Sequence, residues 1–200
     1  MKKLNLLLLA GAAALLSACI PSVNPFYTDK DVVFDPRLLG EWQEKDTRDQ
    51  PEIWGFEKAN EKNYKLTTTD KEGKRGEFDA NLFKLKQELF LDLMPTKCDY
   101  ATNQADLVSV AMFPGHLIVR VPQLGSELKL AMIDYDWLEK HLKSNPKALA
   151  HHREDDRILL TADTRALQRF VLKHLGEEEL FPKPGKMVRK SGASGGAKAN

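Results

Sequence analysis

Short runs of alternating apolar and polar residues occupy most of the chain between residues 38 and 133. Alternation with a period of two is typical of β-strands that bury one face. It is clearest where Leu89, Leu91 and Leu93 share one face, so Asp92 between them is expected to face solvent. The expected strands are residues 38–44, 52–58, 63–69, 77–86, 87–94, 107–113, 116–121 and 127–133. Because their connections are mostly short, and parallel strands need long crossovers, the pattern predicts an antiparallel β-meander.

Two amphipathic helices are expected after the meander. The first follows Asp134, a good N-cap residue, and ends at Asn145 before a proline. A short strand at residues 157–160 precedes the second helix, which begins near Asp163 and ends at Gly176. Helices with one apolar face usually pack on a sheet or a barrel. The chain is therefore expected to be mainly β, of the α+β kind, with two late helices packed on the sheet.

The N-terminal residues have the pattern of an export signal. Two lysines precede an apolar stretch, residues 4–16, which is too short to span a bilayer comfortably and suits the apolar region of a signal peptide. We expect residues 1–18 to be a signal peptide and residues 19–33 to be a tether that leads into the domain. The folded domain is then expected over residues 34–181. Residues 182–200 are rich in glycine, lysine and serine and are expected to form a disordered basic tail.

The end of the signal peptide, Leu16-Ser17-Ala18-Cys19, resembles the lipobox of bacterial lipoproteins. The resemblance implies cleavage after Ala18 and attachment of a diacylglycerol to the sulfur of Cys19, with a further acyl group on its amine. Two or more acyl chains give stable membrane anchoring without a spanning helix. Ile20 after the anchor favours the outer membrane, facing the periplasm. The alternative is an ordinary secretory signal that happens to contain a cysteine.

Gly40-Glu41-Trp42, at the start of the first expected strand, resembles the opening signature of lipocalins and lipocalin-like proteins. The resemblance implies an eight-stranded antiparallel barrel whose base is closed by Trp42, with the final helix outside it. Asp134-Tyr135 matches the second lipocalin motif only loosely, and no counterpart of the arginine in the third motif is evident. With the lipobox, the chain resembles bacterial lipoproteins that carry a lipocalin-like domain, a group without an established activity. The alternative is an unrelated β-meander with a tryptophan in its core.

Charge and cysteine content exclude some classes of function. The chain has 30 basic and 29 acidic residues, but all the acidic residues lie between residues 20 and 180. Seven bases lie outside that range, so the expected domain is net acidic and lacks the clustered positive charge of nucleic-acid binding. If Cys19 is lipidated, Cys98 has no partner for a disulfide. We expect Cys98 to be a small buried side chain rather than a reactive thiol, because no histidine lies near it in sequence.

No motif of an enzyme or of a metal site is evident, and no cofactor is expected. The histidine and acid cluster at residues 151–156 contains metal-ligand types, but neighbouring side chains of an extended chain point to opposite sides. A solvated loop is the favoured interpretation of this cluster. Gly-x-Ser-x-Gly occurs only at residues 192–196, in the expected tail, and Ser-x-x-Lys occurs at residues 126–129 and 144–147, at an expected turn and at the end of an expected helix. None of these matches has the structural context that the catalytic motif needs. A hydrolase with a dispersed site is thus the least favoured of three hypotheses.

The other two hypotheses concern the interior of the expected barrel. An incompletely filled barrel can hold a ligand, whereas a filled one is a solid core. The first hypothesis is therefore a membrane-anchored binding module for a small apolar ligand or lipid. The second is a protein-interaction or inhibitor module of a cell-envelope complex, with a solid barrel. The aromatic residues that could line a cavity or fill the core are Trp42, Trp54, Phe56, Phe78, Phe83 and Phe90.

Overall fold

The computed structural model describes residues 20–45, 47, 50–98 and 114–190. The expected signal peptide, Cys19, the expected strand at residues 107–113 and the last ten residues lie outside the described residues, as does the side chain of Cys98. Among the helices within these ranges, none is both long and apolar enough to cross a membrane.

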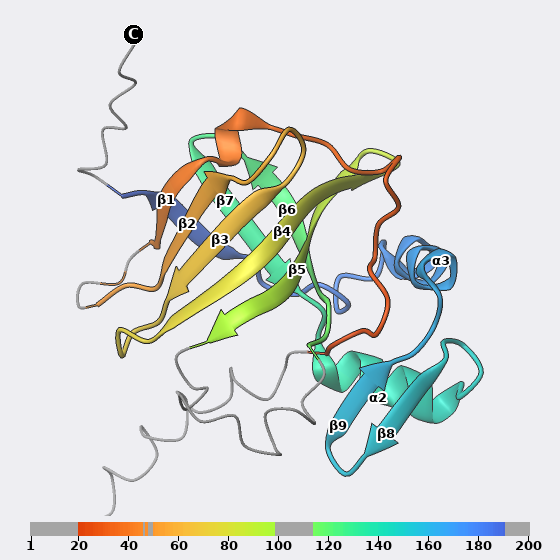
Figure 1. Cartoon of the computed structure of the whole chain (residues 1–200). Coiled ribbons are helices and arrows are strands. Elements are labelled where there is room, and N and C mark those ends of the chain that lie inside the picture. The colour runs from red at the N-terminus through yellow and green to blue at the C-terminus, as the bar shows by residue number, and fades with distance from the viewer. Residues whose placement is uncertain (1–19, 46, 48–49, 99–113, 191–200) are drawn as a thin grey trace, which may run out of the picture.

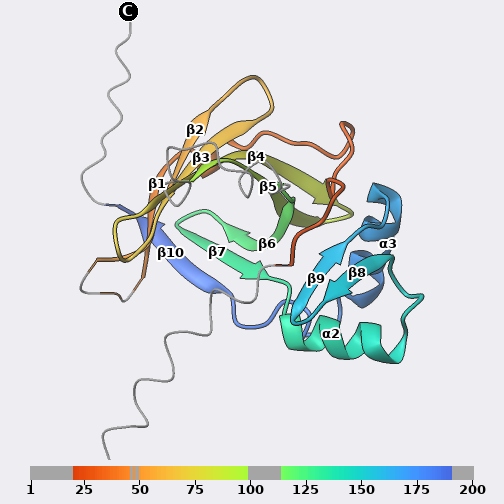
Figure 2. The ribbon, with the colours of Figure 1, turned by 60° about the horizontal axis from the view of Figure 1, so that its bottom comes forward.

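Eight strands form a closed antiparallel barrel (Figures 1 and 2). They are β1 (Gly40–Glu44), β2 (Ile53–Lys58), β3 (Tyr64–Thr69), β4 (Arg75–Leu85), β5 (Glu88–Cys98), β6 (Leu117–Leu124), β7 (Glu127–Met132) and β10 (Gly185–Arg189). The first seven follow one another as a meander, and β10 closes the barrel between β7 and β1. The predicted fold class, a mainly β protein with an antiparallel barrel of the lipocalin-like kind, is confirmed.

The last strand of the barrel lies in the segment that the sequence predicted to be a disordered tail. Strand β10 pairs with β1 on one side and with β7 on the other, so the folded domain extends to Lys190 rather than ending at residue 181. Only Met187 of this strand is buried, and its neighbours are mostly exposed or half-buried. A strand with one buried side chain has little local pattern, and its two pairing partners supply the backbone hydrogen bonds that hold it.

Helices and a separate hairpin lie between β7 and β10. They are α2 (Tyr135–Ser144), β8 (His151–Glu154), β9 (Arg157–Leu160) and α3 (Thr164–His174), while a 3-10 helix, η1 (Pro36–Leu38), precedes β1. Both predicted helices are confirmed with their caps, because Asp134 accepts from the Trp137 N–H and Asp163 accepts from the Ala166 N–H, each at 2.8 Å. The solvated loop expected at residues 151–156 is instead strand β8 and a tight turn, although most of its side chains are exposed.

Two apolar cores result, one on each side of the barrel wall. The inner core fills the barrel around Trp42. The outer core lies between the wall and the late elements, where α2, α3 and β9 cover β4 to β7. Phe83 and Phe90 belong to this outer core and stack with ring centroids 5.5 Å apart. These two of the six aromatic residues considered for a cavity therefore point away from the barrel interior.

Residues 20 to 33, the expected tether, are packed against the domain. Ile20 and Phe26 are buried in the outer core. Ser22 pairs through its backbone with both His116 and Leu160, and Val32 pairs with Phe83. The prolines of this segment exclude a helix, but they do not prevent extended chain from packing. The packed part of the described chain thus includes its first residue, Ile20.

Candidate functional site

The cross-strand register defines which side chains point into the barrel. Residues directly opposite one another in an antiparallel pair share a face of the sheet. Trp42 is buried inside and faces Trp54, which faces Thr68, which in turn faces Gly76. A second row connects Phe56, Leu66 and Phe78. A third connects Leu82, Leu91, Val119 and Met132. Four of the six aromatic candidates, Trp42, Trp54, Phe56 and Phe78, therefore point into the barrel.

One end of the barrel is closed by packed aromatic side chains. Trp42 is fully buried, and its indole N–H donates to the carbonyl of Leu38 at 2.9 Å. Helix η1, which contains Leu38, crosses this end at the top of Figure 1. The hydroxyl of Tyr64 accepts from the Asp35 N–H at 2.6 Å and donates to the Asp35 carbonyl at 3.1 Å. Phe34 stacks on the Tyr64 ring at 4.9 Å. These contacts agree with the expectation that Trp42 closes the base.

Arg189 of β10 lies over the ring of Trp42, with its guanidinium carbon 4.0 Å from the ring centroid. It also donates to the carbonyls of Leu39 and Arg37, so it fastens the last strand to η1. Burial lowers the pKa of Arg189 below its usual range, yet an arginine remains charged at neutral pH. The sequence offered no arginine for this position because Arg189 falls within the expected tail.

Two physical reasons explain why position 40 is a glycine. Its φ is +103°, in the region that favours glycine. A Cβ at this position would also lie 2.7 Å from Nη1 of Arg189. Gly40 therefore leaves room for the guanidinium that covers Trp42, and both predicted signature residues belong to the closed end.

The opposite end of the barrel is lined by apolar side chains that remain partly exposed. This set consists of Trp54, Phe78, Leu117, Leu130 and Met132, which we call the mouth residues. They come from four strands, and each lies near the end of its strand that is farther from η1. Gly76 adds space here, because a Cβ would lie 3.0 Å from Thr68 Oγ1 and 3.1 Å from the Phe78 ring. Figure 2 views the barrel from this side.

Polar side chains near the mouth residues are held by hydrogen bonds and an ion pair. The indole N–H of Trp54 donates to Glu52 Oε1 at 2.7 Å, so the ring is held at the edge with its apolar face available. Glu44, at the end of β1, pairs with Lys71 at 3.0 Å, and the hydrogen bond from Lys71 holds the pKa of Glu44 below its usual range. Partly exposed apolar side chains with a few fixed polar groups beside them are typical of surfaces that bind small molecules.

Asp92 is buried on the outer face of the wall, so the prediction that it faces solvent was wrong. Its carboxylate accepts from the Phe26 N–H at 2.9 Å, and Nδ1 of His116 lies 2.6 Å from its other oxygen. Because a carboxylate only accepts, Nδ1 carries the proton of this hydrogen bond. The error has a clear cause, since β5 is buried on both faces and its alternation therefore does not mark a solvent side.

Ser22, His116 and Asp92 lie together, but they do not form an accessible triad. The Ser22 hydroxyl is fully buried and has no hydrogen-bond partner within the described part of the chain. A nucleophile must be reachable by its substrate, and this serine is buried where the N-terminal segment packs on β9 and the residue before β6. The arrangement instead fastens the N-terminal segment to the barrel through Asp92.

A second group of polar side chains lies between α2 and α3. Nδ1 of His174 is 2.7 Å from Glu177 Oε1, and the ring of His141 lies 4.5 Å from that of His174. The His174 hydrogen bond lowers the pKa of Glu177. Burial, followed by the neighbouring His174, lowers the pKa of His141, which is therefore neutral at pH 7. Trp137 stacks on His141 and meets His174 edge-on, and Phe170 packs against both rings, so this pair is part of the outer packing.

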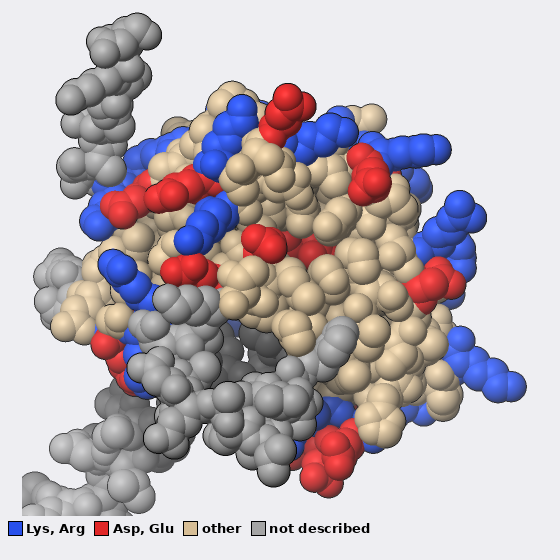
Figure 3. All heavy atoms as spheres, in the orientation of Figure 1, with Lys and Arg blue, Asp and Glu red and all other residues tan. Residues whose placement is uncertain are grey.

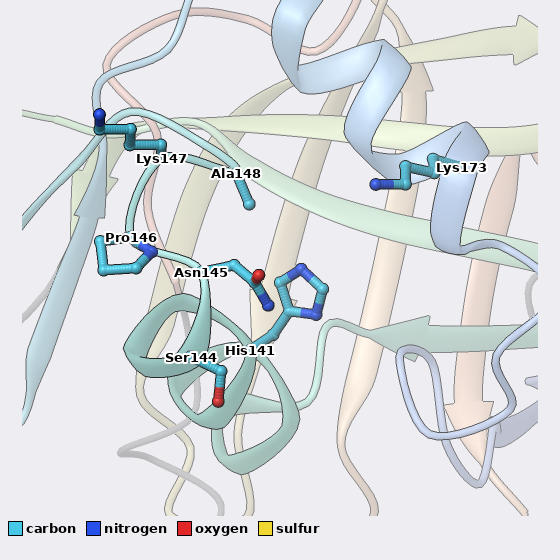
Figure 4. A pocket seen from close by; sticks show the side chains of 7 residues that line it. All are labelled: His141, Ser144, Asn145, Pro146, Lys147, Ala148 and Lys173. Carbon is cyan, nitrogen blue, oxygen red and sulfur yellow. The ribbon is translucent and has the colours of Figure 1, made fainter.

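Beside His141 is a surface cleft of about 550 Å³ (Figure 4). It is lined by His141, Ser144, Asn145, Pro146, Lys147, Ala148 and Lys173. Lys173 reaches from α3 toward the space above His141, whereas the ammonium group of Lys147 points away. The cleft is broad and open to solvent, and none of its lining residues faces the barrel interior.

Charged side chains do not define a further site on the face shown in Figure 3, where basic and acidic groups are interleaved. Within the described ranges, no group of three or more His, Cys, Asp or Glu side chains is placed to hold a metal ion. The apolar inner face of the described barrel is therefore the candidate site, and we call the end with the partly exposed mouth residues the open end. Comparison with known proteins found no family model, no curated protein and no solved structure that matches this chain.

Proposed function

We propose that the protein is a lipoprotein of the cell envelope, anchored through Cys19, whose barrel binds a small apolar ligand or a lipid. The observation that supports this proposal is the set of half-buried, inward-facing mouth residues at the barrel end away from η1. Apolar surface that remains accessible in a concave site gains free energy when a ligand covers it, at about 25 cal/mol per Å².

The largest inward-facing aromatic side chains are more deeply buried near η1 than at the mouth, which supports entry of a ligand at the mouth. At the closed end Trp42, Phe56 and Tyr64 are buried to within 1% of their surface, and Arg189 seals the Trp42 ring from outside. At the open end, inward-facing side chains of the same chemical kind stay partly accessible. A ligand would therefore enter past Trp54 and Phe78 and lie above the packed floor.

A substitution in the mouth tests the ligand site. Leu130→Asp places a carboxylate among the mouth residues, and an ionised group is strongly disfavoured in apolar surroundings. We expect it to weaken binding of a dansyl-labelled fatty acid, measured by fluorescence titration, by at least about tenfold, equivalent to about 1.4 kcal/mol. Lys129→Asp is the matched control, because Lys129 is the neighbouring residue of β7 on the opposite face; its affinity should stay close to that of the unmodified chain.

Two results would contradict a ligand-binding barrel. One is the absence of saturable probe binding. The other is equal binding by the Leu130→Asp and Lys129→Asp chains, which would place the probe elsewhere. Native mass spectrometry of the Cys19→Ala chain, expressed in a bacterial host, should in addition show an extra mass that organic solvent extracts as lipid.

The anchor is tested separately. Replacement of Cys19 by alanine removes the only sulfur that the lipobox presents for lipid attachment. We expect the substituted chain to leave the membrane fraction, since without acyl chains no described helix can hold the chain in the bilayer. Fractionation with a salt wash measures this, and a Cys98→Ala chain that stays with the membrane is the control. A Cys19→Ala chain that remained bound after the wash would contradict the proposed anchor.

The packed floor also favours a second candidate, a protein-interaction or inhibitor module with a solid barrel. Thirteen side chains of the inner core are buried, and many of them are large. If the titration detects no probe binding and the mass spectrum shows no extra mass, we expect the partly exposed mouth residues to contact a protein partner instead. Cross-linking in the envelope would then identify the partner.

A further inference from the structure

We propose that the open end of the barrel faces the membrane to which the chain is anchored, so that the partner of this end is the lipid surface itself. This inference rests on the proposed anchor at Cys19. It adds to the proposed function by assigning an orientation and a route, because a ligand would pass between the bilayer and the mouth residues without crossing water.

The described chain is packed against the domain from its first residue, Ile20. Ile20, the residue after Cys19, is only 5% exposed and lies in the outer core. Ser22 exchanges two backbone hydrogen bonds with His116, at 2.9 and 2.8 Å. Leu160 donates its N–H to the Pro21 carbonyl, and its own carbonyl accepts from the Val23 N–H, both at 2.9 Å. Consecutive Cα atoms are about 3.8 Å apart, so a lipid on Cys19 is joined directly to the folded body.

The N-terminal segment contacts the barrel at the end that carries the mouth residues. His116 directly precedes Leu117, the first residue of β6 and one of the mouth residues. Gly115 lies against the same segment, since a Cβ there would be 2.6 Å from Pro21 Cβ. In Figure 1 the first described residues lie at the bottom beside α2, whereas η1 and the closed end lie at the top. The lipid therefore leaves the protein at the open end.

Apolar side chains are exposed on the surface close to Ile20. Val23 is the large apolar side chain with the greatest exposure in the described part of the chain, at 36%. A groove of about 320 Å³ lies beside Pro21, and its lining combines Tyr135, Ile158 and Leu159 with His152, Glu154, Asp156 and Arg157. Tyr135 begins α2 just after β7 ends at the open side. Apolar side chains edged by polar ones suit the boundary between lipid headgroups and acyl chains.

Two exposed turns at opposite ends of β4 allow the orientation to be measured. Glu72 lies in the turn before β4, at the open end, and Gln87 lies in the turn after it, at the closed end. The eleven residues of β4 separate these turns by about 30 Å at about 3.3 Å per residue. Each position is changed to cysteine in a Cys98→Ser chain, labelled with a fluorophore, and reconstituted by its own lipid in phosphatidylethanolamine and phosphatidylglycerol vesicles.

A nitroxide on the lipid headgroup then quenches whichever label lies close to the bilayer. We expect the Glu72→Cys label to be quenched at least twofold more than the Gln87→Cys label. Inserting about ten Gly and Ser residues between Cys19 and Ile20, with an average reach of about 17 Å, should reduce this difference while the chain stays attached. Equal quenching of the two labels without the insert, or stronger quenching at Gln87, in a chain that remains on the vesicles would overturn the orientation alone.

The failure of the anchor has a different signature. An unmodified chain that does not remain with the vesicles, or a Cys19→Ala chain that remains with them equally well, would overturn the proposed lipid attachment. The fatty-acid titration of the Cys19→Ala chain is independent of both results, since it needs no membrane. Orientation, anchor and ligand binding are thus distinguishable in these experiments.

Discussion

Replacing Trp42 by alanine is expected to lower the free energy of unfolding by about 4 kcal/mol, within the range measured for buried aromatic residues. The indole is fully buried at the closed end. Its loss leaves a cavity under η1, removes the donor to the Leu38 carbonyl, and takes away the ring on which the Arg189 guanidinium lies. Denaturation by urea, followed by circular dichroism, measures the change.

Trp54→Ala is the matched control for this prediction. Trp54 is the direct cross-strand partner of Trp42 on the same inner face, but it is half-buried at the mouth. Its removal leaves a surface indentation rather than an enclosed cavity, so we expect less than half the loss of stability. Equal losses for the two substitutions would show that the closed end is not the tightly packed floor that the proposed site needs.

Replacing Asp92 by alanine is expected to cost about 3 kcal/mol, because it leaves two buried donors without their acceptor. The Phe26 N–H and His116 Nδ1 both lose their hydrogen bond to the carboxylate. The consequence should be local as well as global, since Phe26 belongs to the segment that follows the anchor. Hydrogen exchange is expected to accelerate most for the backbone amides of residues 20 to 33.

Asp79→Ala is the matched control, because Asp79 is an exposed carboxylate on the outer face of the neighbouring strand. Exposed substitutions usually change stability by no more than about 0.5 kcal/mol. If Asp92→Ala were as mild as Asp79→Ala, or if exchange rose evenly over the barrel, then Asp92 would not fasten the N-terminal segment. The N-terminal segment would then not hold the domain in the proposed orientation.

The N-terminal segment connects the two proposals of function. Its residues contact the start of β6 and the end of β9, and they lie at the end of the barrel that carries the mouth residues. A flexible tether would leave the barrel free to rotate above the membrane. The packed segment instead restricts the domain, and a ligand-binding barrel near its lipid source is the functional consequence we propose.

Local patterns were sufficient to predict much of the barrel. Strands β1 to β7 and helices α2 and α3 follow from alternation, turn residues and N-caps, because these features act within a few residues of the chain. The same holds for the closed end, where Gly40 and Trp42 could be recognised from sequence. The short strand β8 was missed, because its mostly exposed side chains give no apolar period of two.

Only the tertiary structure decided which polar residues are buried and where the domain ends. The sequence around Asp92 in β5 does not reveal that a second core covers the outer wall. That core depends on side chains from α2, α3 and residues 20 to 33, which are distant in the chain. Strand β10 depends on pairing with β1, about 145 residues earlier in the chain. Arg189 meets Trp42 through that pairing.

The sequence by itself determined the strands of the meander, the two helices and the closing tryptophan, since each depends on neighbouring residues. The tertiary structure decided the last strand, the burial of Asp92, the partial exposure of the mouth residues and the packing of Ile20. The reason is physical. Burial and strand pairing depend on surfaces contributed by distant parts of the chain, and such surfaces exist only once the barrel has closed.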